Sequence, residues 1–348
     1  MNKKEIKDKF NSLREKYGEL LIRLKRNKIH SDKWSEYIFK EFKEEEISFI
    51  FGQNIWRFSE KDNDEVNLGK GTKAIISKGS SRLLISPEKA GILTWICCDG
   101  YMSTHSGGHY INIRDDDIIV FNYFKRIVEE VYGKVNFQIA KIKDKNAYQC
   151  LFCSKETFRD ILTYIPLSST REWSIPIELL NEKAKIEVLR ILTHAEGTVF
   201  KTNRSRAIEV TLANLTTLIQ AQSLFEEFEI PSKLRKDFSG RWERYKIRIG
   251  RRENLEKFRK LIHFIPNTKK YDKFENILKG YKIYSNQDCR EKLLESIRKR
   301  EISKTKDFGR LLKFHSATIS KNLGMLKKEG LIDYNKGIGN SRHWFNKF

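Results

Sequence analysis

The sequence contains an internal repeat with an offset of 97 residues. Shifting the 348-residue chain by this distance places Asp99-Gly100 on Glu196-Gly197. The register continues without a gap from residue 92 to about residue 158 and slips by three only in the last helix. A repeat of this length indicates two copies of one supersecondary unit that fold in the same way.

Each copy predicts the same order of elements: helix, β-hairpin, helix, β-hairpin and helix. The first helix ends in an acid and a glycine in both copies, and the middle helix has apolar residues mostly three or four apart, as in Ile118, Phe121 and Phe124. We therefore predict an α+β fold with two pseudo-symmetric αββαββα units. The units span residues 88–166 and 182–267, within a domain at 88–270.

Two nonapeptides in these copies carry a family resemblance. ILTWICCDG at residues 92–100 and LRILTHAEG at residues 189–197 share an apolar body and an acid-glycine end, with Glu in place of Asp in the second. The pair resembles the two-motif, single-chain type of the LAGLIDADG homing endonuclease family. The resemblance covers about residues 88–267 and implies a saddle in which the two motif helices pack side by side.

The resemblance also implies a catalytic centre. Asp99 and Glu196 would meet at the bottom of the saddle and bind Mg²⁺ or another divalent cation, since such ions prefer oxygen ligands. The metal would activate water for hydrolysis of a phosphodiester bond. Members of the family use basic groups near the start of the last helix, and Lys155 and Arg252 occupy these places. Both could instead contact only phosphates, and the fold could be retained without cleavage.

The predicted hairpins differ in charge between the copies. The first copy is richer in Ser, Thr, His and Asn, which can recognise base edges in a major groove. The second copy is basic, although strand alternation places only about half of its cations on one face. The expected DNA contacts from the second copy are Lys201, Arg204, Arg206, Lys233, Arg235, Arg244, Lys246 and Arg248.

Residues 282–348 form a second basic module, with 16 Lys and Arg against seven Asp and Glu. The pattern of three helices followed by a short hairpin resembles a winged helix-turn-helix. Its third helix would enter a major groove and its wing would contact the backbone. An alternative is a winged helix used for protein contacts. The expected DNA contacts are Ser316, Thr318, Lys321 and Asn322 in the helix and Lys336 and Arg342 in the wing.

The first 87 residues are predicted to be a mostly helical region of unknown role. A basic amphipathic helix covers residues 1–30, a second helix starts at Ser31, and the polar residues 58–75 indicate a loop. This region could be another helix-turn-helix or a cover for the nuclease-like fold.

Composition narrows the class of protein. Lys and Arg number 68 against 46 Asp and Glu, a formal charge of +22, which predicts an anionic partner such as nucleic acid. The chain has no apolar run of about 18 residues and no hydrophobic leader, so we expect a cytoplasmic protein without a membrane partner. Cys150 and Cys153 would point to opposite faces of a strand, which predicts buried thiols and no zinc site.

These observations favour a monomeric, site-specific protein that binds double-stranded DNA and cleaves it with Mg²⁺ as an endonuclease. The alternative is a transcription regulator that uses the same fold and the winged helix without cleavage, as in bacterial sporulation regulators that join a LAGLIDADG-like domain to a helix-turn-helix. RNA processing is a third possibility, less favoured because winged helices mostly bind duplex DNA.

Overall fold

A computed structural model of the chain describes residues 3–29, 33–51, 64–77, 80–105, 107–165, 173–202, 205–237, 243–279, 286–299, 304–312, 314, 316–337 and 342–347. The chain forms two compact units, residues 1–278 and 279–348. In these described ranges no helix is both long and apolar enough to cross a membrane.

The described part of the N-terminal region contains three helices followed by a three-stranded sheet. Helices are present in both predicted places, although the predicted start of the second at Ser31 lies outside the described residues. The prediction of a loop at 58–75 is wrong from residue 64 onward, because a three-stranded antiparallel sheet begins there. Val66 and Leu68 on the first strand and Thr72 and Ala74 on the second are buried at a spacing of two, which is the period of a strand. The elements are α1 (Lys3–Arg26), α2 (Trp34–Glu41), α3 (Glu44–Phe51), β1 (Asp64–Gly69), β2 (Thr72–Ser77) and β3 (Ser80–Ile85).

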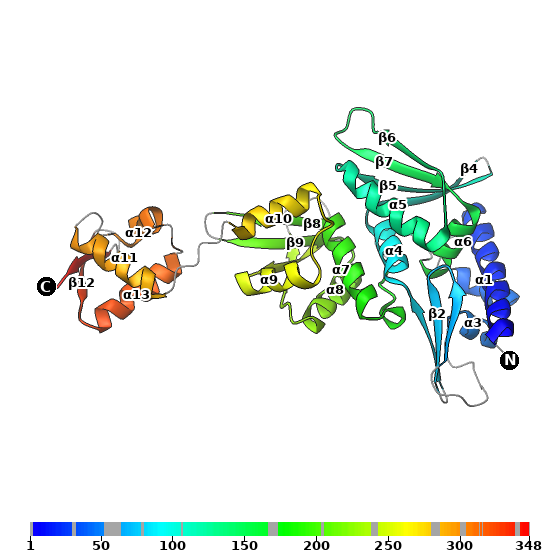
Figure 1. The fold of residues 1–348 in the computed structure, drawn as a ribbon, viewed down its shortest axis with the longest axis horizontal. Coiled ribbons are helices and arrows are strands. Elements are labelled where there is room, and N and C mark those ends of the chain that lie inside the picture. Colours follow the sequence, from blue (N-terminus) through cyan, green and yellow to red (C-terminus); the bar gives the residue numbers. More distant parts are fainter. Residues whose placement is uncertain are drawn as a thin grey trace. The chain divides into compact units, whose positions relative to one another are not determined.

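The two predicted αββαββα units are confirmed (Figure 1). The first has sheet order β4-β5-β7-β6 and the second has the equivalent order β8-β9-β11-β10. The first comprises α4 (Pro87–Asp99), β4 (Gly100–His105), β5 (Gly108–Asp115), α5 (Ile118–Tyr132), β6 (Phe137–Lys141), β7 (Tyr148–Cys153) and α6 (Lys155–Tyr164). The second, after a 3-10 helix (Ile177–Leu179), comprises α7 (Glu182–Glu196), β8 (Gly197–Lys201), β9 (Arg206–Leu212), α8 (Leu215–Glu227), β10 (Lys233–Asp237), β11 (Arg244–Gly250) and α9 (Arg252–Leu261).

Equivalent polar side chains start the middle helix of each unit. Asp117 caps α5 by accepting a hydrogen bond from the Ile119 amide, and Asn214, 97 residues later, caps α8 by accepting one from the Thr217 amide. Such caps satisfy backbone donors that the helix itself leaves without a partner. The helices of each unit then cover one face of its sheet, which leaves the opposite sheet face uncovered by them (Figure 1).

The motif helices α4 and α7 pack directly against each other. Trp95 of α4 is fully buried and lies edge-on to His194 of α7, with 6.4 Å between ring centroids. Gly91 allows close approach, because a Cβ atom there would lie 3.1 Å from the Glu187 side chain of α7. This contact joins the cores of the two repeat units and brings the C-terminal ends of both helices together.

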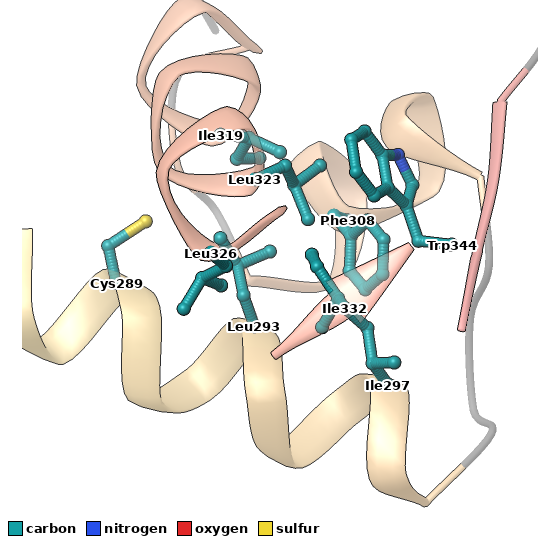
Figure 2. Packing of buried hydrophobic residues seen from close by; sticks show 9 residues of the cluster. All are labelled: Cys289, Leu293, Ile297, Phe308, Ile319, Leu323, Leu326, Ile332 and Trp344. Carbon is teal, nitrogen blue, oxygen red and sulfur yellow. The ribbon is translucent and has the colours of Figure 1, made fainter. Parts of the chain in front are cut away.

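The C-terminal unit has three helices and a two-stranded antiparallel hairpin, as expected. Its core gathers apolar side chains from all five elements, with Phe308, Leu323 and Trp344 among them (Figure 2). A further helix, α10 (Lys269–Lys279), lies between the repeat and this unit in the chain. The elements of the unit are α11 (Asn286–Arg298), α12 (Thr305–Leu312), α13 (Ser316–Lys328), β12 (Ile332–Lys336) and β13 (Arg342–Asn346).

Candidate nucleic-acid interface and carboxylate cluster

The two acids singled out in the sequence end the two motif helices. Asp99 is the last residue of α4 and Glu196 the last of α7, and each is followed at once by a strand. The glycine after each acid is required by space: a Cβ atom on Gly100 would lie 2.3 Å from Ile96 Cα, and one on Gly197 would lie 2.1 Å from the Thr193 carbonyl oxygen. The acid-glycine pair therefore marks a helix that passes into a strand without a loop.

Asp99 and Glu196 are close enough to interact electrostatically. Burial, and then the negative charge of Asp99, raise the pKa of Glu196 to about 7. Burial also raises the pKa of Asp99. A third acid, Asp115 at the end of β5, joins them: burial raises its pKa to about 6, and Asp99 adds to the effect. We call Asp99, Asp115 and Glu196 the carboxylate cluster.

A lysine that the sequence analysis missed points into this cluster. The Nζ atom of Lys270 on α10 donates hydrogen bonds to the carbonyl oxygens of His194 and Ala195, the latter at 3.1 Å. Its charge lowers the pKa of Asp99, Asp115 and Glu196 against the effect of burial. Because α10 follows the repeat and has no counterpart in it, the 97-residue offset could not identify Lys270.

The two predicted catalytic cations lie at the other end of the hairpins. Lys155 follows Ser154, whose amide donates to the His109 carbonyl, and His109 pairs with Thr104, four residues along β4 from Gly100. Four strand residues span about 13 Å. Lys155 instead forms an ion pair with Glu19 of α1 at 2.9 Å. Neither Lys155 nor Arg252 is among the charges that shift the pKa of Asp99 or Glu196.

Arg252 has an equivalent position in the second unit. It starts α9 just after Gly250, which pairs with Ala207, and Ala207 pairs with Phe200 of β8. Phe200 is three residues, or about 10 Å, along the strand from Gly197. The 97-residue offset thus identified Lys155 and Arg252 as equivalent positions in the two units, but the structure does not bring either cation to the acids.

Five of the predicted DNA-binding cations share the uncovered face of the second sheet. On β11 the apolar Ile247 and Ile249 are buried, so the alternating residues face the other way. The register then places Lys233 beside Arg248 and Arg235 beside Lys246. The five cations of this face, which we call the basic face, are Lys233, Arg235, Arg244, Lys246 and Arg248.

Two acids on the same face are each paired with one of these cations. Glu209 lies 2.8 Å from Arg248, and Asp237 lies 3.6 Å from Lys246. Lys233 and Arg235 are exposed. The basic face therefore keeps a net positive charge.

Other predicted contacts are placed differently. Lys201 and Arg206 lie opposite each other in the strand register at the end of the hairpin. Both alternate with the residues of the uncovered face and therefore belong to the buried side of the sheet. Arg204 lies outside the described residues. Lys201 and Arg206 therefore do not lie on the basic face.

The uncovered face of the first sheet is almost uncharged, and we call it the neutral face. Its central rows join Tyr101, Asn112, Leu151 and Gln138 across four strands. Tyr101 is 62% exposed, and Asn112 lies 3.5 Å from Gln149, which points to the same side. Arg114 is the charged side chain on this face within the described strand residues. Amide and hydroxyl groups dominate it, as the sequence predicted.

One predicted contact in the C-terminal unit is wrong. Asn322 is fully buried and its amide donates to the Thr318 carbonyl at 2.9 Å, so it cannot contact a groove. It lies three residues from the buried Ile319 and therefore on the core side of α13. Lys321, Lys336 and Arg342 are exposed and Thr318 is partly exposed, while the side chain of Ser316 lies outside the described part.

The cysteines give no zinc site. Cys150 is buried and Cys153 exposed on opposite faces of β7, and both thiols are free. The prediction of opposite faces is confirmed, but the prediction that both are buried is wrong for Cys153.

The carboxylate cluster fits a divalent metal poorly. A metal there would have two side-chain ligands at most, Asp99 and Glu196, since over the ranges that the structure describes no group of three His, Cys, Asp or Glu side chains is arranged to hold a metal ion. Asp99 and Glu196 also share their surroundings with the positive charge of Lys270. We derive no reaction step through Mg²⁺ for this reason.

Comparison with protein-family profiles identifies a known domain in the second unit of the repeat. The profile of the LAGLIDADG-like domain family matches residues 183–263, within the second unit. No curated protein matches the chain by sequence. Among solved structures, I-DmoI in complex with DNA and Ca is 17% identical, covers 50% of this chain and 88% of its own, and has a TM-score of 0.39. Full-length DUF199/WhiA from Thermatoga maritima is 14% identical, covers 70% and 92%, and also scores 0.39. The family match thus covers a LAGLIDADG-like domain at residues 183–263.

Proposed function

We propose that this chain is a site-specific double-stranded-DNA-binding protein that contacts DNA through the basic and neutral faces together. The observation that carries the proposal is the row of five cations in register on one sheet face, opposite the helices. Such a row tracks phosphates, whose contacts supply most non-specific affinity. The amide and hydroxyl groups of the neutral face are suited to base edges.

The C-terminal unit adds a second DNA-binding element in this proposal. Its exposed cations lie on α13 and on both strands of the hairpin, at Lys321, Lys336 and Arg342. A winged helix with this distribution inserts its third helix into a major groove and lays the hairpin along the backbone. This favours duplex DNA over RNA, whose major groove is too narrow for a helix.

Within this function, binding without cleavage is the better supported mode. Its support is the separation of Lys155 and Arg252 from the acids, together with the engagement of Lys155 by Glu19. A transcription regulator of this kind needs the DNA-binding faces and no hydrolytic centre. Mg²⁺-dependent endonuclease activity is the second candidate, favoured by one observation, the interaction of Asp99 with Glu196 at the ends of the paired helices.

One selection and one reaction test both modes. The full chain would select a bound duplex from a randomised DNA pool, and the selected duplex would then be incubated with Mg²⁺ and resolved on a denaturing gel. The matched control is the double variant Asp99→Asn, Glu196→Gln. We expect an enriched site and no cleavage by either protein.

The outcomes separate the candidates. Cleavage of both strands by the wild type, lost in the double variant while binding persists, would establish the endonuclease. Absence of any enriched duplex, with an enriched structured RNA in a parallel pool, would overturn the proposal of duplex DNA as the ligand.

A further inference from the structure

We propose that the ammonium group of Lys270, which is held by carbonyl oxygens at the end of α7, is the built-in cation of the carboxylate cluster and disfavours a divalent metal at Asp99 and Glu196. The cluster would therefore bind no divalent cation tightly. Only the consequence for DNA, binding that does not depend on such a cation, rests on the function proposed above.

The contacts of Lys270 are with the end of a motif helix. Its Nζ atom donates to the carbonyl oxygens of His194 and Ala195, the residues just before Glu196. Carbonyl groups in the last turn of a helix have no intrahelical donor and carry partial negative charge. Together with carboxylates they form the kind of oxygen shell that hard divalent cations select. Here an ammonium group donates to two of these oxygens.

The lysine is held in place by the chain on either side of it. The amide of Lys269 donates to Asp117 Oδ2 at 2.7 Å, and the Lys269 ammonium donates to the Asp116 carbonyl at 2.7 Å. Further along α10, Phe274 is 1% exposed and packs edge-on against Phe258 and Phe264. The first unit thus anchors the start of α10 and the second unit anchors its body, so that Lys270 is directed between them.

Lys270 is the cation whose charge acts on all three acids of the cluster, and Arg244 acts on Glu196 as well. Asp115, Asp99 and Glu196 all act to raise the pKa of Lys270 against the effect of burial. A metal ion placed among the same carboxylates would have a positive charge beside it in a partly buried region. Since charge repulsion is weakly screened there, the affinity for the ion falls.

Calorimetric titration of Mn²⁺ into the full chain at pH 7.5 tests the inference. Lys270→Met keeps the length of the side chain and removes its charge, whereas Lys270→Arg keeps the charge. Lys273→Met is the matched control, because Lys273 is exposed on the same helix and takes no part in anchoring Lys270. We expect Lys270→Met to bind Mn²⁺ at least tenfold more tightly than the wild type, Lys270→Arg and Lys273→Met. Adding Asp99→Asn and Glu196→Gln to Lys270→Met should remove the gain.

The wild type alone can overturn the inference, even if Lys270→Met does not fold. A saturable Mn²⁺ site in the wild type that disappears in the Asp99→Asn, Glu196→Gln variant would mean that Lys270 leaves room for a metal. A folded Lys270→Met variant with no gain over the wild type would also contradict it.

DNA binding is measured separately so that the two proposals can fail independently. Fluorescence anisotropy with the selected duplex, in EDTA and in Mg²⁺ at matched ionic strength, should give affinities within about twofold of each other. Loss of binding in EDTA would contradict the inference. Absence of duplex binding under both conditions would defeat the proposed function and leave the Mn²⁺ titration to decide the role of Lys270.

Discussion

The two sheets of the repeat share one topology and differ in the face that they leave uncovered. Both have the same strand order, the same covering helices and the same helix-to-strand passage at an acid and a glycine. The second sheet presents five cations, whereas the first presents Asn112, Gln149 and tyrosines. The buried side of each strand preserves the fold after duplication, and the alternating residues are free to diverge. The comparison suggests that one face anchors phosphates and the other recognises bases.

Removing charge from the basic face should have the largest effect. We expect Lys233→Ala with Arg235→Ala to weaken duplex binding by about ten- to a hundredfold at moderate salt and to reduce the salt slope by about two. Both side chains are exposed, so folding should be unaffected. The control is Lys260→Ala with Lys273→Ala, which removes the same charge from exposed positions on α9 and α10. Equal losses for both pairs would mean that only net charge matters.

The raised pKa of Glu196 should make the stability of the protein depend on pH. Burial raises the pKa of Glu196 to about 7, so the folded protein holds this proton more tightly than the unfolded chain does. The folded state is therefore favoured at low pH, and this contribution to the free energy of unfolding is lost as pH rises through about 7. We expect the free energy of unfolding of the wild type to fall by on the order of 2 kcal/mol between pH 5 and 8 because of this group. In Glu196→Gln this fall should be absent. Denaturant unfolding across this range measures it, with Glu226→Gln on the surface of α8 as the control. A wild-type stability that does not fall relative to Glu196→Gln would refute the shift.

Changes on the neutral face should alter specificity more than affinity. Asn112→Ala with Gln149→Ala removes two amide groups that can bind base edges. We expect discrimination against a changed base pair to fall by about tenfold, with the salt slope unchanged. Competition between the selected duplex and single-base variants measures this. If the salt slope falls as much as in the basic-face variant, the proposed division of roles between the sheets is wrong.

The smallest effect is expected from α13 in the C-terminal unit. Lys321 is exposed and Asn322, its neighbour, is buried. Lys321→Ala should weaken DNA binding by about threefold with little change in thermal stability. Asn322→Ala should destabilise the unit by about 1 kcal/mol, since it removes the hydrogen bond to Thr318, and leave specificity intact. Thermal melts and DNA-binding curves measured for both variants distinguish these effects. Loss of stability in Lys321→Ala and loss of binding in Asn322→Ala would mean that the Asn322 side of α13, and not the Lys321 side, faces DNA.

The repeat made most of the fold and part of the site predictable. A fixed offset aligns every element of the second unit with one of the first, so even short strands were found without a strong pattern of their own. The strands at 64–77 and 80–85 have no second copy, and their polar turn residues concealed a period of two. Burial of Asn322 was missed because a polar side chain was assumed to face solvent. Lys270 was missed because nothing in the local sequence shows that α10 returns to the acids.

Asp117 links parts of the chain that are synthesised far apart in time. One carboxylate oxygen caps α5 at Ile119, and the other accepts the amide of Lys269, 152 residues later. The second contact cannot form until α10 has left the ribosome, because the chain is synthesised from its N-terminus. Until then the acids at the two helix ends lack the lysine that balances them. The carboxylate cluster therefore gains its contact with Lys270 only when the whole repeat and the helix after it have been made.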